Sequence, residues 1–130
     1  MAVSVLDTSV LIGFLRTDDD LHLRSRAAMS DLASTEWVVP TTVCAELLVG
    51  AHRTSEDAVE LVDRFLSEGI DRIEPLTLEI ARFAAVIRAA NPPLSLPDAF
   101  VLATGDVTGA DVVLTADRRW AKVSPRVRIA

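Results

Sequence analysis

The sequence predicts a three-layer α/β fold, with a mostly parallel central sheet of about four to five short strands flanked by helices. Short β-branched runs alternate along the chain with longer segments of helical periodicity. No repeat, low-complexity segment or linker interrupts this alternation. A chain of 130 residues has the length of one domain with its own core. We therefore expect a single domain over residues 1–130.

The N-terminal half is expected to begin with a buried strand that runs directly into a helix. Val3 and Val5 suit a buried strand, and Thr8 or Ser9 can cap a helix over residues 10–15. The further elements predicted in this half are helices at residues 21–32, 43–50 and 55–67 and a proline-terminated strand at residues 36–40.

The C-terminal half continues the pattern. Residues 77–90 carry an amphipathic stripe that predicts a helix, with Phe83 on its buried face. Ser95 is a good N-cap for the next helix, and Gly105 and Gly109 are expected to bracket the end of that helix. The strands predicted in this half are a buried one at residues 111–114 and weaker ones at residues 72–74 and 127–129.

The composition excludes several classes of protein. No apolar run approaches the roughly 20 residues that a membrane-spanning helix needs. The first residues contain no basic segment and quickly reach Asp7, which is unlike a secretory signal. Cys44 is the only cysteine, so neither an internal disulfide nor a zinc knuckle can form. We expect a cytoplasmic protein without a membrane partner.

The charge distribution is uneven. A formal net charge of −6 argues against a protein that simply coats nucleic acid, but not against a nuclease whose acids hold metal. Positive charge beside Asp117 suits a phosphate-bearing substrate or an acidic partner, and an ordinary solvated end is the equal alternative. Within this group Arg118 and Arg119 are candidates for gripping substrate phosphates. The basic residues gathered here are Arg118, Arg119, Lys122, Arg126 and Arg128.

Four acids are placed to meet at one edge of the predicted sheet. Asp7 and Asp117 each stand just past a strand, and Glu46 and Asp98 each stand near the start of a helix. Ligands of open parallel sheets bind at the carboxyl ends of the strands. Carboxylates crowded there raise one another's pKa values unless a cation neutralises them. Oxygen ligands favour Mg²⁺ or Mn²⁺ over zinc.

Three of these four acids also have an ordinary structural interpretation. Asp7 can serve as the N-cap of the helix that follows it, and Asp98 can complete a capping box with Ser95. Glu46 falls on the polar side of its helix, as a solvent-facing glutamate does.

The motifs resemble those of a known family. Asp7-Thr8-Ser9 after the first strand, Glu46-Leu47 in a helix, Pro97-Asp98-Ala99 and Thr115-Ala116-Asp117 are similar, in order and spacing, to the PIN-domain ribonucleases. The whole length of the chain looks most like the VapC toxins of bacterial toxin–antitoxin pairs. Trp120 stands where the family often has an aromatic or apolar residue close behind the last acid.

The resemblance implies a three-layer PIN-like domain that acts as a metal-dependent endoribonuclease. Asp7, Glu46, Asp98 and Asp117 would be its catalytic and metal-binding acids, with Thr8, Ser9 and Thr115 as polar supports. Asp7 and Asp98 would be the main ligands of one or two ions of Mg²⁺ or Mn²⁺, and Glu46 would orient or deprotonate the attacking water. The implied partners are an RNA substrate, a small antitoxin and a second copy of the chain.

Two alternatives to the nuclease remain open. A small-molecule phosphatase of the haloacid-dehalogenase type wants a second Asp two residues after the first, where this chain has Ser9. A receiver-like regulatory module that binds Mg²⁺ wants paired acids in the first loop and a well-placed lysine, and the only lysine is Lys122.

Overall fold

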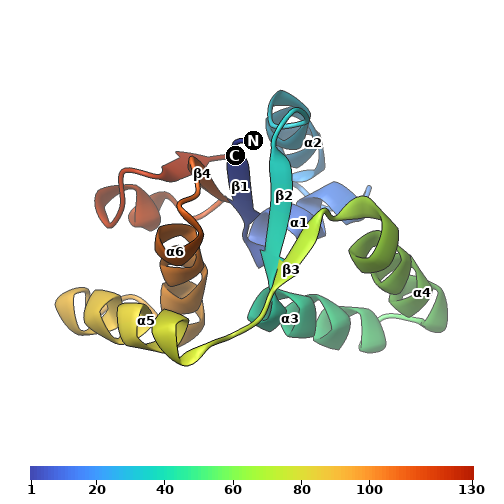
Figure 1. The fold of residues 1–130 in the computed structure, drawn as a ribbon. Coiled ribbons are helices and arrows are strands. Elements are labelled where there is room, and N and C mark those ends of the chain that lie inside the picture. The colour runs from blue at the N-terminus through green and yellow to red at the C-terminus, as the bar shows by residue number, and fades with distance from the viewer.

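The computed structural model describes all residues from 1 to 130. Five strands form one sheet in the order β3-β2-β1-β4-β5, and every neighbouring pair is parallel (Figure 1). The prediction of the α/β class is therefore confirmed. The elements are β1 (Val3–Leu6), α1 (Thr8–Leu15), α2 (His22–Asp31), β2 (Glu36–Pro40), α3 (Thr41–His52), α4 (Glu56–Arg64), β3 (Arg72–Glu74), α5 (Leu78–Ala90), α6 (Leu96–Thr108), β4 (Val112–Thr115) and β5 (Val127–Ile129), with a π-helical turn at Phe65–Gly69 and a 3₁₀ turn at Arg118–Lys122.

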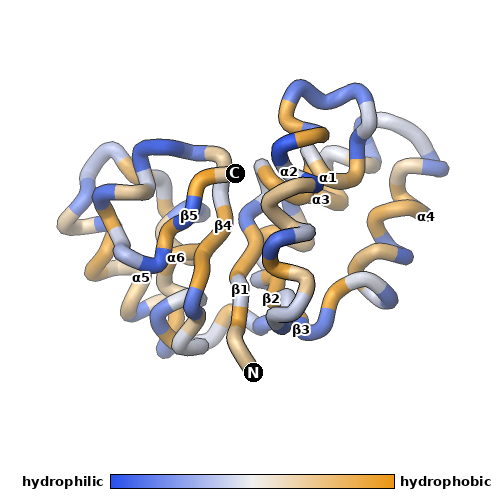
Figure 2. Tube along the Cα trace, turned by 90° about the horizontal axis from the view of Figure 1, so that it is seen from above, coloured by the Kyte–Doolittle hydropathy of each residue, from blue (hydrophilic) through white to orange (hydrophobic).

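The helices lie on both faces of the sheet. Crossovers between parallel strands are right-handed, so the direction in which the chain moves along the sheet decides which face each helix covers. From β1 to β3 the chain moves outward in one direction, and from β3 to β4 it returns past β1. Accordingly α5 and α6 lie on one side of the strands and α1 to α4 on the other (Figure 2).

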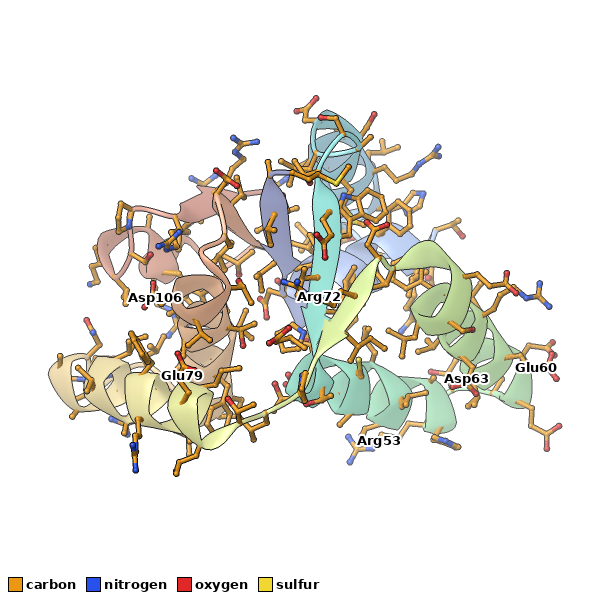
Figure 3. All side chains as sticks on the ribbon, in the orientation of Figure 1. Arg53, Glu60, Asp63, Arg72, Glu79 and Asp106 are labelled. Carbon is orange, nitrogen blue, oxygen red and sulfur yellow. The ribbon has the colours of Figure 1, made fainter.

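The core is densest around the two central strands. Val5 and Leu6 of β1 and Val113 and Leu114 of β4 are completely buried. Val5 is paired with Val38 on one side and with Val113 on the other. Burial on both faces explains why these strands are apolar except for Ser4 and Thr115, instead of alternating between apolar and polar residues. Apart from Asp7, the charged side chains lie outside this core, and that of Glu60 on α4 points away from the body of the molecule (Figure 3).

Three local expectations are corrected by the structure. Neither Thr8 nor Ser9 caps α1, because the N-cap residue is Asp7 and both hydroxyls bond elsewhere. Phe83 is 44% exposed rather than buried, since Ile80 and Ala84 form the inner face of α5. The helix predicted at residues 55–67 stops being α-helical at Arg64 and continues as the π turn.

The two glycines of α6 have different roles. Gly105 lies inside the helix, not at its end, and a Cβ there would come within 2.5 Å of the Val113 side chain. Its missing side chain therefore lets α6 approach β4 closely. Gly109 ends the helix with φ of 65°, a left-handed conformation that glycine adopts without strain.

No helix of this chain is both long enough and apolar enough to span a bilayer.

Candidate functional site

Asp7 stands at the carboxyl end of the central strand. Its backbone N–H still donates to the Leu114 carbonyl at 3.0 Å, so β4 fixes its position. The residue is only 7% exposed. It occupies the N-cap position of α1, yet its side chain accepts no cap hydrogen bond. The interpretation of Asp7 as a helix cap is therefore wrong, and its carboxylate is free for another purpose.

Two hydroxyls hold one oxygen of this carboxylate. Ser9 Oγ donates to Asp7 Oδ2 at 2.9 Å, and Thr115 Oγ1 donates to the same oxygen at 2.8 Å. Ser9 Oγ in turn accepts the N–H of Ala116 at 3.1 Å, and Thr115 Oγ1 accepts the N–H of Asp117 at 3.1 Å. Because each hydroxyl accepts a backbone N–H, its single proton is directed at Asp7. Oδ2 is thereby fixed, and Oδ1 receives no side-chain donor.

The environment of Asp7 disfavours its charge. Burial raises the pKa of Asp7 from its ordinary 3.8 to about 6. Hydrogen bonds from Thr115 and Ser9 oppose this rise in pKa, and the nearby charge of Asp98 adds to it. Neutral hydroxyls therefore position the carboxylate without supplying the positive charge that would compensate its burial.

Asp98 faces this carboxylate from the first turn of α6. Ser95 Oγ accepts the Asp98 N–H at 3.2 Å, which is the expected cap, but the Asp98 carboxylate makes no return bond to the Ser95 backbone. Only half of the predicted capping box forms. Burial raises the pKa of Asp98 above its ordinary value, and the charge of Asp117 adds to this rise.

Asp117 lies beyond β4 and already has a cation. Arg119 donates to Asp117 through its backbone N–H at 3.0 Å, through Nε at 3.0 Å and through Nη2 at 2.7 Å. These bonds hold the pKa of Asp117 below its ordinary value. The Arg119 side chain, predicted to grip substrate, is thus directed first at Asp117, whereas Arg118 is exposed and forms no ion pair.

Glu46 reaches the site from α3. It is exposed on the second turn of that helix, and its Oε1 accepts a hydrogen bond from Thr8 Oγ1 at 3.0 Å. This bond joins the start of α1 to α3 beside Asp7. The polar-face prediction for Glu46 is confirmed, and the same exposure leaves Oε2 open to solvent or a ligand.

One further group at the site is the Trp120 indole, which the residue motifs did not assign a role. Trp120 is 1% exposed, and its indole Nε1 has no hydrogen-bond partner. The indole lies beside Asp98 and Asp117 and lowers the pKa of both carboxyl groups. Its signal in the sequence was its place three residues after Asp117, where the family resemblance leads us to expect an aromatic or apolar residue.

The donor set fits a hard divalent ion. Asp7, Glu46, Asp98 and Asp117 offer only oxygen, and Asp7 Oδ1 carries no side-chain donor. No three side chains of His, Cys, Asp or Glu are grouped closely enough to hold one metal ion together. Mg²⁺ is commonly bound through one or two carboxylates, with water and substrate phosphate as its remaining ligands. The pair Asp7 and Asp98 is the part of the set that suits this mode.

The two main cavities lie beside the acids rather than among them. One, of about 290 Å³, lies between α1, α3 and α4 and is largely apolar, with Ile12, Leu47 and Val62 in its lining. The other, of about 200 Å³, lies where the α5–α6 connection meets the 3₁₀ turn, and Arg119 lines it.

The fold and the site define a class of protein. Residues 4–124 match the PIN domain family, and the chain belongs to that family. PIN domains are typically nucleases, and the family typically binds Mg²⁺. No curated protein matches the chain in sequence.

Solved structures of toxin–antitoxin systems share the fold. FitAcB from Neisseria gonorrhoeae has a TM-score of 0.77 at 20% identity, covering 98% of this chain and 96% of that one. VapC20 from Mycobacterium tuberculosis, a toxin that cleaves the sarcin–ricin loop, has a TM-score of 0.76 at 16% identity, covering 93% and 95%. The DNA-bound VapBC of Salmonella typhimurium has a TM-score of 0.68 at 25% identity, covering 100% and 98%.

Proposed function

We propose that this chain is a divalent-metal-dependent endoribonuclease that hydrolyses RNA phosphodiester bonds and acts as the toxin of a toxin–antitoxin pair. The observation that carries the proposal is the Asp7 carboxylate. It is buried at the carboxyl end of the central strand, held on one oxygen by two neutral hydroxyls, and faced by a second carboxylate. Such an arrangement raises the free energy of the ionised folded protein unless a cation binds.

In this proposal Asp7 and Asp98 hold Mg²⁺ or Mn²⁺, and Asp117 and Glu46 complete the acidic surroundings. The ion, when bound, lowers the pKa of water and withdraws electron density from the scissile phosphate. Ser9 and Thr115 keep Asp7 Oδ1 turned toward the ligand by fixing Oδ2. Arg119 forms an ion pair with Asp117. Its positive charge therefore limits the electrostatic repulsion between Asp117 and Asp98.

Glu46 is the proposed base. Thr8 holds Oε1, so Oε2 is the atom left to orient a water and to accept its proton. The proton then passes to solvent, because Glu46 is exposed. The hydroxide that remains attacks phosphorus, the bond between phosphorus and the ribose oxygen on the opposite side breaks, and that ribose oxygen takes a proton from solvent.

We also propose a small antitoxin and a second copy of this chain as partners. VapBC2 of Rickettsia felis and the VapBC of Salmonella typhimurium crystallised as toxin–antitoxin assemblies. A contact between copies is supported by large apolar side chains that are exposed on α5 and just before it, which soluble monomers seldom group together. These are Leu76, Leu78, Phe83 and Val86, which are 46%, 67%, 44% and 71% exposed.

The experiment is cleavage of labelled single-stranded RNA by the purified chain with Mn²⁺ or Mg²⁺, then with EDTA. We expect cleavage with metal, none with EDTA, and none by Asp7→Asn. Asp31→Asn removes the same charge from an exposed site on α2 and serves as the matched control with full activity. Cleavage that survives in Asp7→Asn would contradict the assignment. Hydrolysis of small phosphate esters but not of RNA would favour the phosphatase, and metal binding without hydrolysis would favour the receiver-like module.

A further inference from the structure

A second pocket opens next to the acidic site, on the side of the 3₁₀ turn. It has a volume of about 200 Å³ and lies between the C-terminal end of α5, the connection to α6, and the turn that follows Asp117. This volume is below the ~300–1,000 Å³ typical of pockets for whole small molecules. The residues that line it are Ala90, Asn91, Pro92, Pro93, Leu94, Arg119, Lys122 and Val123.

Arg119 belongs to both the pocket and the acidic site. Its Nε and Nη2 bind Asp117, and its charge is felt by Asp98. Its Nη1 makes no hydrogen bond in the structure. A guanidinium can serve two anions at once because its donors fan out in one plane. A ligand anion bound to Nη1 would therefore lie beside the acids, at a different edge of the Arg119 guanidinium from Asp117.

Lys122 supplies the free positive charge. It is the only lysine of the chain, it is exposed, and it forms no ion pair. The last turn of α5, which ends at the pocket, carries Arg88 and no acid. In a chain with a net charge of −6, the two charged residues that line the pocket, Arg119 and Lys122, are both cationic.

The opposite wall of the pocket is rigid and mostly apolar. Pro92 and Pro93 have fixed φ angles, and the turn they form is closed by the Leu94 N–H, which donates to the Asn91 carbonyl at 2.9 Å. Asn91 Nδ2 donates to the Ile87 carbonyl at 2.9 Å, so its side chain is also held. Cations on one wall and proline rings on the other suit a group that is anionic at one end and flat and apolar at the other.

We propose that this pocket binds one nucleotide of the RNA strand next to the cut phosphate, as a substrate subsite. The phosphate of that nucleotide contacts Arg119 Nη1 and Lys122 Nζ, and its base packs against Pro92 and Pro93. This inference rests on the proposed ribonuclease function. It adds the direction in which the RNA strand runs away from the acidic site. The subsite contacts the backbone and the flat face of a base. It therefore favours single-stranded RNA and does not select a particular sequence.

The test measures binding of a short labelled single-stranded RNA to the uncleaving Asp7→Asn protein as salt is varied. Adding Lys122→Glu should weaken binding to every RNA sequence. It should also reduce the slope of log affinity against log salt by about 0.7, the value for one lost phosphate contact on a single strand. Lys122→Arg should restore the affinity. Arg26→Glu changes the same charge at an exposed, unpaired site on α2, away from the 3₁₀ turn (Figure 1), and should leave the slope unchanged.

A second measurement separates the subsite from the nuclease function. In the otherwise unaltered protein, Lys122→Glu should raise KM for a long RNA. It should leave KM unchanged for a dinucleotide, whose only phosphate is the one that is cut and which therefore offers Lys122 no phosphate to contact. Equal KM values and equal salt slopes in Lys122→Glu and Arg26→Glu would overturn the subsite even if RNA is cleaved normally. Failure of the unaltered protein to cleave RNA would instead overturn the proposed function, while the salt slopes would still report on the pocket.

Discussion

Asp7 and Asp117 stand in equivalent places and have opposite electrostatics. Each follows one of two adjacent parallel strands, β1 and β4, at the same edge of the sheet. Asp7 is buried and receives hydrogen bonds only from neutral groups, and burial raises its pKa to about 6. Asp117 is more open and receives three hydrogen bonds from Arg119, and its pKa is lowered.

The difference shows that strand position alone does not give an acid its role. Asp117 has its counter-charge within the chain, so a metal ion must compete with Arg119 for it. Asp7 has no such partner, and a cation from solution would relieve the cost of its burial. We therefore expect Asp7 to dominate metal binding and Asp117 to contribute less.

The largest effect is expected on cleavage. Asp7→Asn should reduce metal-dependent RNA hydrolysis to background, whereas Asp117→Asn should cost about 10- to 100-fold, as the loss of a supporting group does. Single-turnover cleavage rates in saturating Mn²⁺ measure both. Equal losses of cleavage rate in Asp7→Asn and Asp117→Asn would contradict the unequal roles inferred for the two carboxylates.

The same pair of variants should move stability in opposite directions. The folded-state pKa of Asp7 is raised, so its protonated form favours folding; this contribution is complete below pH 3.8 and is lost as pH rises through about 6. Without metal at pH 8, Asp7→Asn should therefore be more stable by up to about 3 kcal/mol, the free energy of a shift of about two pKa units. Asp117→Asn should be less stable by under about 1 kcal/mol, because it loses a surface ion pair.

Chemical denaturation at pH 4 and pH 8 in EDTA tests this prediction. The gain in Asp7→Asn should be present at pH 8 and should shrink toward zero at pH 4. A variant that is destabilised at both pH values would mean that the carboxylate stabilises the fold.

The two hydroxyl groups that hold Asp7 Oδ2 can be tested separately. Thr115→Val keeps the shape of a fully buried side chain and removes one donor to Asp7 Oδ2. The pKa of Asp7 should rise further, so the acid limb of the pH–rate profile should move to higher pH, with about a 10- to 100-fold loss of metal affinity or rate. Thr108→Val, whose hydroxyl bonds only within α6, is the matched control and should leave the profile in place.

The smallest effect concerns the cation on Asp117. Arg119→Gln should raise the pKa of Asp117 toward its ordinary value, and that of Asp98 should follow slightly, because Arg119 lowers both. Carboxyl ¹³C chemical shifts followed through a pH titration report each group. A pKa of Asp117 that does not move would show that Arg119 is not what lowers it.

Much of the fold could be predicted because each strand has a local signature. The apolar runs at β1 and β4 and the short strand Arg72–Glu74 lie where the sequence indicated. Phe83 was misplaced because amphipathic periodicity identifies an apolar stripe but not which of its members lies at the edge of the contact. The π turn after Arg64 carries no residue that distinguishes it from a continuing helix.

The candidate site was less predictable than the fold. The four acids could be named from their places at element boundaries, but Asp7 taken alone was better explained as the cap of α1, and only the family resemblance favoured a catalytic role. Only the structure shows Ser9 and Thr115, far apart in sequence, meeting on one oxygen of Asp7. The ion pair between Asp117 and Arg119 depends on a side-chain conformation that two-residue spacing does not dictate.

The central claim is that the buried carboxylate of Asp7 binds a divalent cation. Calorimetric titration of the purified protein with Mn²⁺ at pH 6, in buffers of different ionisation enthalpy, tests it directly. We predict binding accompanied by release of a fraction of a proton, because Asp7 is partly protonated at that pH, and loss of both in Asp7→Asn. Equal affinity and equal proton release in Asp7→Asn and the unaltered protein would contradict the account.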